Sequence, residues 1–239
     1  MDPSTATILV AGAGGRTGGA VVEVLLDAGI ELRAFVHSND DAERLRERGV
    51  EDVLVGDCLV RDDVARAVEG VDILVCTVGS SPGLRQVTGS DVVDGAGVER
   101  LVDAASEAEV GHFVLVSSLG VGNSRRGMPM PFRILLSRIL DAKAGGETHL
   151  QQSGLTYTIF RPGGLSSDPP TRDVLVGEGG ESVTGSIPRG DLARLLVAAA
   201  FTPEAANRTF EVVARDRTRT TPKRVVDVDW HVPEPIFTG

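Results

Sequence analysis

The chain of 239 residues has only two cysteines, Cys58 and Cys76, and they stand apart without CxxC or Cys/His spacing. Their spacing indicates neither a zinc site nor a disulfide framework. We therefore expect both thiols to be small buried apolar side chains and expect no bound metal.

Long hydrophobic runs are also missing. No apolar run approaches the roughly 18 residues of a membrane span, and residues 1–7 are short and polar. We therefore expect a cytoplasmic protein without a membrane segment.

Positive charge is scarce. The 34 acidic residues outnumber the 24 basic ones, for a net charge of -10, and such a surface repels nucleic acid and anionic membranes. Only two of the basic residues, Lys143 and Lys223, are lysines. An acidic, lysine-poor composition is typical of a salt-adapted source or of codon bias, and the sequence leaves both open.

The chain is otherwise rich in apolar segments, with 41% hydrophobic residues, and its length suits one large α/β domain or two small ones. Apolar runs typical of buried strands alternate with helical stretches. The expected strands are 7–11, 31–36, 53–55, 72–77, 112–117 and 156–161, and the expected helices are 17–28, 42–48, 62–69, 91–109 and 132–152. This alternation predicts a doubly wound parallel sheet with helices on both faces.

The pattern loosens after Arg161, where only a helix at 189–201 and a strand at 209–213 are expected. We interpret residues 1–239 as one domain with a core of 7–165. Residues 166–239 would form a small C-terminal lobe and tail over the carboxyl ends of the strands, where open α/β sheets bind ligands.

The most informative stretch is the glycine turn Gly12-Ala-Gly-Gly-Arg-Thr-Gly18, which joins the first strand to the first helix. Gly12 allows a tight bend, Gly15 lets the backbone approach a pyrophosphate, and Gly18 permits close packing of helix on strand. The amides and the dipole at the helix start attract anions. A glycine turn in this context predicts a Rossmann-type α/β fold that binds a dinucleotide.

The end of the second strand bears on which dinucleotide binds. An acidic residue there would bond the ribose 2′-hydroxyl of NAD and repel the 2′-phosphate of NADP. The strand ends instead in His37 and Ser38, and Arg16 lies in the glycine turn. These donors favour NADP(H). In the alternative, Asp40 or Asp41 reaches the ribose and Arg16 is a solvated loop residue.

Further segments follow the glycine turn in a fixed order. They are Gly56-Asp57, Thr77-Val-Gly79, Val93-Asp94 with Gly97, Phe113 to Gly120, Ala142-Lys143 with Glu147, Ser153 to Gly163, and Ile187 to Ala193. The ordered set resembles the atypical short-chain dehydrogenases, in particular the NAD(P)H-binding, NmrA-like group that includes flavin and biliverdin reductase-like enzymes. The resemblance covers roughly residues 7–201.

This resemblance implies a cofactor that lies across the carboxyl ends of the strands. Asp57 and Cys58 would flank the adenine, and residues 77–79 would line the path of the ribose and pyrophosphate. The implied catalytic residues are Lys143, Ser117 and Ser118. The implied cofactor contacts are Gly12, Gly14, Gly15, Arg16, Thr17, Gly18, His37, Ser38, Asp57, Cys58, Thr77, Val78, Gly79, Ser117, Lys143, Pro162 and Gly163.

One departure from this group concerns its usual tyrosine, which stands four residues before the lysine on the same helix face. In this chain the position is Ile139. Isoleucine cannot exchange a proton, so tyrosine-dependent oxidation of alcohols is not expected. The only tyrosine, Tyr157, lies in an expected buried strand. We interpret the histidines His112, His149 and His231 as packed or solvated.

Three functions fit these residues. We favour an NADP(H)-dependent reductase of a planar or conjugated small molecule, such as a flavin or quinone, because such an acceptor takes its proton from water. The Met- and Pro-rich segment 125–131 suits that substrate, or is only a loop. The alternatives are a non-catalytic NADP(H) sensor, as NmrA-like regulators are, and a sugar-nucleotide epimerase or dehydratase. We expect a monomer or homodimer without nucleic-acid or membrane partners.

Overall fold

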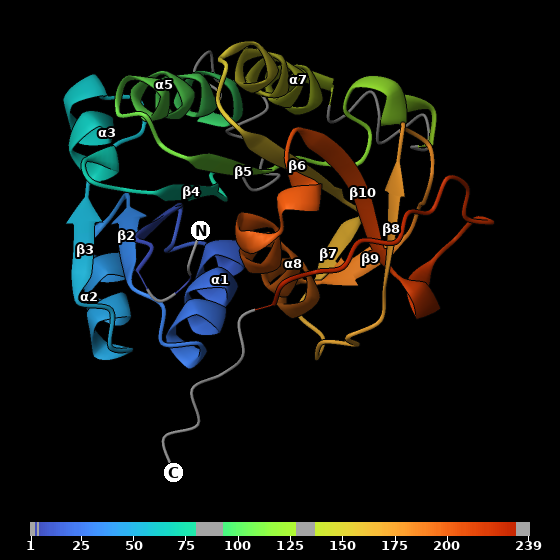
Figure 1. Ribbon diagram of the computed structural model, residues 1–239, viewed down its shortest axis with the longest axis horizontal. Helices are drawn as coiled ribbons and strands as arrows, with labels where there is room; N and C mark the ends of the chain where they lie inside the picture. The colour runs from blue at the N-terminus through green and yellow to red at the C-terminus, as the bar shows by residue number, and fades with distance from the viewer. Residues whose placement is uncertain (1–2, 4, 80–92, 128–136, 233–239) are drawn as a thin grey trace.

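The computed structural model of the protein describes residues 3, 5–79, 93–127 and 137–232, which surround an eight-stranded sheet (Figure 1). The strands lie in the order β3-β2-β1-β4-β5-β6-β10-β8. Neighbouring strands are parallel except β8, which is antiparallel to β10. The bounds are β1 (Ile8–Ala11), β2 (Leu32–Val36), β3 (Asp52–Val55), β4 (Ile73–Cys76), β5 (His112–Val116), β6 (Tyr157–Pro162), β8 (Val174–Glu178) and β10 (Arg208–Ala214). Two further short strands, β7 (Gly164–Ser166) and β9 (Ser186–Pro188), pair with each other.

Helices cover both faces of this sheet (Figure 1). One face carries α1 (Arg16–Asp27), α2 (Asn39–Glu47) and α8 (Arg189–Phe201), and the other carries α3 (Arg61–Val68), α5 (Val93–Glu107) and α7 (Ser137–Gln152). Three short 3₁₀-helices complete the described elements: η1 (Gly122–Gly127), η2 (Pro203–Ala205) and η3 (Arg215–Arg217). None of the helices within the described ranges is long and apolar enough to cross a bilayer.

The apolar character of the strands explains this layering. In β1, Ile8 and Val10 pack into the core on the α1 side, whereas Leu9 and Ala11 pack into the core on the α5 side. All four side chains are fully buried. A strand that is covered on both faces must be apolar at every position, and the continuous apolar runs of the sequence therefore predict the doubly wound sheet that is observed.

The chain reverses direction in the middle of the sheet. From β1 it runs outward through β2 to β3, and it then crosses back to β4 on the other side of β1. The connections that leave β1 and β4 therefore diverge, and open α/β sheets bind ligands at such a point.

The C-terminal region extends the main sheet. Helix α8 has the expected bounds, and β10 is one residue longer at each end than the expected strand. β10 pairs with β6, and β8, which the sequence analysis did not anticipate, adds a further strand. The tail is held through Trp230, whose ring packs edge-on against Phe210 at 5.6 Å between ring centres. Residues 166–232 therefore contribute to the core of the fold.

Candidate functional site

The glycine turn brings the start of α1 to the carboxyl edge of the sheet. Gly12 has a left-handed backbone with φ of +82°, and the amides of Gly12 and Ala13 donate to the Phe35 carbonyl. A Cβ on Gly18 would overlap the Gly12 carbonyl and lie 2.8 Å from the Cα of Ala13. Gly15 is exposed and directly precedes Arg16 and Thr17, the first residues of α1. The positive end of the α1 dipole therefore points at this edge.

A cleft of about 450 Å³ lies beside the turn, within the size range of small-molecule and cofactor pockets. Nine of the expected cofactor contacts line it, namely Gly12, Gly14, Gly15, His37, Asp57, Cys58, Thr77, Val78 and Gly79. They come from the carboxyl ends of β1, β2, β3 and β4. The Thr77 hydroxyl donates to the Ala11 carbonyl at 2.9 Å, so Thr77 also fastens β4 to the glycine turn.

Asp57 and Cys58 lie in the part of the cleft that follows β3. One carboxylate oxygen of Asp57 accepts from the Leu59 amide at 2.8 Å, which fixes the local turn. The Cys58 side chain is half-buried against Gly97. Burial, together with the neighbouring Asp57, raises the pKa of the Cys58 thiol to about 11, and burial raises that of Cys76 to about 12. Both thiols are neutral and serve as packing groups.

Beyond the end of β2, Asp41 lies at the cleft, as in the alternative that the sequence left open for NAD(H). Ser38 is the N-cap of α2, and its hydroxyl donates to the Asp41 carboxylate at 2.7 Å. That carboxylate lies directly against the glycine turn, because a Cβ on Gly14 would be 2.6 Å from the Asp41 Cγ. Asp41 also lines the cleft, and its second oxygen pairs with Arg44. The position of Asp41 follows from the close approach of α2 to the turn, which no local sequence pattern reveals.

The opposite end of the site contains a buried ion pair. The Lys143 Nζ atom on α7 lies 2.8 Å from an oxygen of Asp94, the second residue of α5, and the Asp94 side chain is 0% exposed. The pair lies beside Gly79, where a Cβ would be 3.1 Å from the Asp94 oxygen and 3.3 Å from the Lys143 nitrogen. Ser117 joins both residues in lining a narrow gap. Asp94 stands in one of the ordered sequence motifs, but no role was expected for it.

The hydroxyls of Ser117 and Ser118, both expected in the site, differ in their hydrogen bonding. The Ser117 Oγ atom is buried and has no hydrogen-bond partner among the described residues. The Ser118 hydroxyl donates to the Leu119 carbonyl at 3.0 Å. An unpaired buried hydroxyl is costly in a folded protein, which marks Ser117 as the more available of the two.

The end of β6 completes this side. The Pro162 carbonyl accepts from the Leu119 amide at 3.0 Å, which connects the ends of β5 and β6. A Cβ on Gly163 would overlap the Gly185 carbonyl, so the chain packs closely there. Just before it, Arg161 forms a buried pair with Glu147, at 2.6 Å. Glu147 lies one helical turn after Lys143, and this pair therefore anchors the segment of α7 that carries the lysine.

A second buried carboxylate, Glu211 on β10, fixes the loop after β5. It accepts from the Ser124 hydroxyl and from the Ser182 amide at 2.6 Å. Burial opposes its ionisation, but the hydrogen bonds from Ser124 and Ser182 outweigh burial, so the pKa of Glu211 lies below its ordinary value. The backbone that follows Ser117 and Ser118 is thereby attached to the sheet.

The structure places Ile139 where the sequence analysis located it, one turn before Lys143 on α7, and its side chain is buried. Tyr157 begins β6 and packs partly buried against the core. His112 is also buried, where its ring contacts the Thr158 hydroxyl at 2.9 Å and burial lowers its pKa to about 4. Of the Met- and Pro-rich segment 125–131, residues 128–131 lie outside the described residues.

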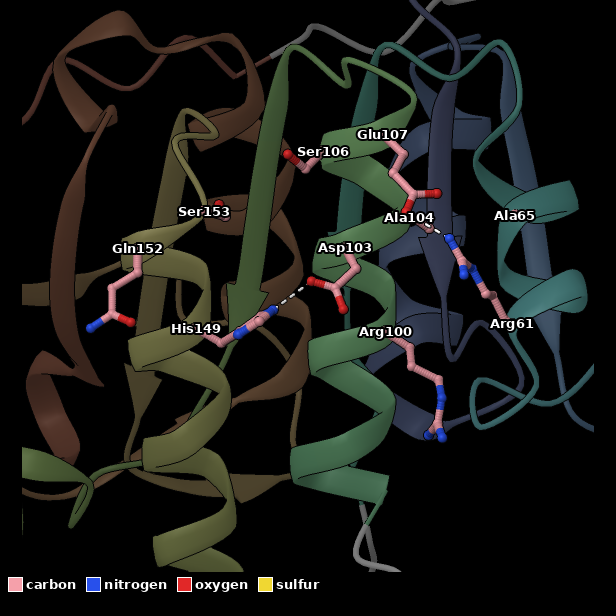
Figure 2. A pocket seen from close by; sticks show the side chains of 10 residues that line it. All are labelled: Arg61, Ala65, Arg100, Asp103, Ala104, Ser106, Glu107, His149, Gln152 and Ser153. Carbon is pink, nitrogen blue, oxygen red and sulfur yellow. Dashed lines mark hydrogen bonds and ion pairs between the residues drawn. The ribbon is translucent and has the colours of Figure 1, made fainter.

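A separate groove of about 800 Å³ runs along the outer surface of α3, α5 and α7 (Figure 2). His149 and Asp103 meet across it at 2.6 Å, and Arg61 meets Glu107 at 2.8 Å. These exposed pairs connect neighbouring helices. None of the expected site residues lines this groove, which is separate from the cleft at the strand ends.

The reversal of strand order beside a glycine turn, with a cleft at that point, defines a Rossmann-type dinucleotide-binding protein. The NAD(P)H-binding family matches residues 12–203, which is most of the chain. The protein therefore belongs to the NAD(P)H-binding family. This finding confirms the resemblance to the atypical short-chain dehydrogenases.

Relatives within this group have several functions. An uncharacterised chloroplastic protein of Arabidopsis thaliana is 35% identical over 221 residues, covering 88% of this chain and 78% of that protein. Sanguinarine reductase of Eschscholzia californica is 26% identical over 245 residues, covering 86% of this chain and 88% of that protein. In both structural matches that follow, the TM-score is 0.78. A putative NAD-dependent epimerase/dehydratase of Bacillus halodurans is 30% identical and covers 89% of this chain and 96% of its own. The anaerobilin reductase ChuY of Escherichia coli O157:H7 is 25% identical, and the match covers 90% of this chain and 99% of ChuY.

Proposed function

We propose that the protein is an NADP(H)-dependent reductase that transfers hydride to a planar, conjugated small molecule of flavin or quinone type. The observation that supports this proposal is the pairing of Lys143 with Asp94 beside Gly79, next to Ser117, with Ile139 in place of a tyrosine. This end of the site can position a cofactor and polarise an acceptor, yet it lacks the usual tyrosine acid.

In this proposal each group has a distinct task. The backbone of Gly12, Gly14 and Gly15 would hold the pyrophosphate at the start of α1. Asp57 and Cys58 would flank the adenine, and Lys143 would orient the nicotinamide ribose through its N–H donors. Pro162 and Gly163 would cover the nicotinamide, which would supply the hydride when bound.

The proton balance explains why a conjugated acceptor fits. Hydride addition leaves a negative charge that is delocalised over the acceptor, and water supplies the proton that completes the reduction. The buried Ser117 hydroxyl can donate a hydrogen bond to the acceptor as its charge develops. A simple ketone would leave a localised alkoxide, which requires a positioned acid, and Ile139 cannot provide one.

NADP(H) is the proposed cofactor because arginines gather beside the glycine turn. A cavity of about 350 Å³ there is lined by Arg16, Arg44 and Arg48 together with Glu23 and Asp41. Arg44 and Arg48 pair with those two acids, whereas Arg16 has no carboxylate partner within the described ranges. The net positive charge suits a 2′-phosphate. The Asp41 carboxylate against Gly14 favours the second candidate, NAD(H).

The reductase relatives support the choice of substrate class, since anaerobilin and sanguinarine are conjugated molecules. The epimerase-like match is a weaker guide, because sugar chemistry of that kind normally uses the tyrosine that Ile139 replaces. A non-catalytic NADP(H) sensor is the second candidate function. Ile139 favours it, because isoleucine cannot exchange a proton as the usual tyrosine does.

Turnover assays separate these candidates. The purified protein is mixed with NADPH and, in turn, FMN, a quinone and a bilin, and loss of NADPH is followed. We expect oxidation of NADPH that depends on both the protein and the acceptor. Tight NADPH binding without turnover for any acceptor would instead establish the sensor.

A further inference from the structure

We infer that Asp94 is the positioning residue that holds the Lys143 ammonium against the nicotinamide-ribose end of the cleft. The inference rests on the cofactor orientation given above, but it does not require turnover. The Lys143 nitrogen lies 2.8 Å from the Asp94 carboxylate, and the side chains are 15% and 0% exposed.

The Asp94 carboxylate is fully buried. A buried carboxylate is costly unless a cation and hydrogen bonds compensate it, so an ordinary core position would not retain one. A lysine side chain that is anchored only at its Cα would extend toward water. Asp94 instead fixes the ammonium at one place, and the ammonium has three N–H donors available to nearby oxygen atoms.

Gly79 lies between the Lys143–Asp94 pair and the cleft. The Cβ of any other residue there would be 3.3 Å from the Lys143 nitrogen and 3.1 Å from the Asp94 oxygen. Gly79 is itself exposed and lines the cleft. The pair therefore faces a position where a ribose hydroxyl can reach the ammonium past the glycine backbone.

The packing of α5 against α7 sets this geometry. A Cβ on Gly146 would be 3.1 Å from a Val98 methyl and 3.4 Å from the Asp94 carbonyl, and a Cβ on Gly95 would be 3.4 Å from the Cβ of Ala142. Two glycines thus allow the helices to approach until Asp94 and Lys143 meet. The neighbouring Arg161–Glu147 pair anchors the next turn of α7.

A purely structural role can be separated from a positioning role by a matched pair of variants. Asp103, on the same helix, also bridges α5 to α7 through His149, but it does so in the outer groove (Figure 2). Asp94→Asn and Asp103→Asn therefore each remove one carboxylate between the same two helices. Only the first change lies beside the cleft.

The experiment measures binding of NADPH and of ADP by calorimetry, with thermal denaturation of each variant. ADP lacks the nicotinamide riboside. We expect Asp94→Asn to weaken NADPH binding by about tenfold or more and to leave ADP binding within about twofold. Asp103→Asn should change neither. Lys143→Met should reproduce the effect, and adding Asp94→Asn to it should cause no further loss.

Equal weakening of NADPH and ADP in Asp94→Asn, or unchanged NADPH binding, would overturn the inference. A different result is expected if the Asp94 inference is correct but the protein is not a reductase. In that case the native protein binds NADPH and reduces no acceptor, while the Asp94→Asn variant still loses NADPH affinity selectively.

Discussion

At the glycine-turn end of the cleft, the fold presents main-chain groups, and four glycines within residues 12–18 determine their arrangement. At the Lys143 end, the relevant groups are side chains from α5, α7 and β5, which meet only in the folded chain. The first arrangement depends on local conformation, and the second depends on how closely two helices pack. Substitutions at the two ends should therefore differ in their effects on stability, cofactor binding and turnover.

The largest effect on folding is expected at the glycine-turn end. Gly18→Ala places a methyl group into the Gly12 carbonyl, where only backbone movement could relieve the overlap. We expect a loss of about 2 kcal/mol or more in the free energy of unfolding. Gly19→Ala is the matched control, because its Cβ would meet nothing closer than 3.6 Å. It should be neutral or stabilising by less than about 1 kcal/mol. Urea unfolding of the two variants measures the difference, and equal stabilities would contradict the packing argument.

A second substitution at the same end should affect binding and leave folding intact. Gly15 is exposed, and the nearest atom to an added Cβ is the Gly12 carbonyl oxygen at 3.2 Å. Gly15→Val should still fold, with some loss of stability at the N-cap of α1, while its side chain blocks the approach of a pyrophosphate to the backbone. We expect affinity for NADPH to fall at least about 100-fold. A variant that melts early but retains the cofactor would show that Gly15 is only a turn residue.

At the other end, Lys143→Ala should mainly reduce turnover. Misplacement of a reacting group by about 1 Å can cost on the order of 100-fold in rate, and we expect a decrease of that size in kcat. The variant should also lose stability, because the buried Asp94 carboxylate loses its ammonium. Turnover is therefore measured well below the melting temperature. Alcohol oxidation should be undetectable in the native protein, and robust alcohol oxidation would contradict the account of Ile139.

The smallest effect is expected in cofactor preference. Arg16→Ala should reduce the ratio of NADPH to NADH affinity by about tenfold, and Asp41→Asn should increase that ratio because it removes a negative charge beside the 2′-position. Arg61→Ala is the control, since Arg61 pairs with Glu107 in the outer groove, away from this cavity. Calorimetry with both cofactors gives the ratios. An unchanged ratio in Arg16→Ala would remove the basis for proposing NADP(H).

The same contrast explains what the sequence could predict. The doubly wound sheet, the glycine turn and the bounds of α8 follow from local patterns of apolar residues and glycine. Strand β8 was missed because it contains Gly177 and follows β6 and β7 without an intervening helix that would give an alternating signal. Asp41 was named only in the alternative that favours NAD(H), and Asp94 was given no role, since each acquires its significance through an approach between elements that one sequence does not encode locally.

The burial of Lys143 has a practical consequence for chemical labelling. The chain has two lysines, of which Lys223 is exposed and Lys143 retains only 15% side-chain exposure beside the cleft. An amine-acylating reagent should therefore modify Lys223 quickly and Lys143 slowly. A dinucleotide that covers the Gly79 side would slow the second reaction further and leave the first unchanged. The ratio of the two adducts in a single digest would thus report cofactor occupancy, with Lys223 serving as an internal standard within the same molecule.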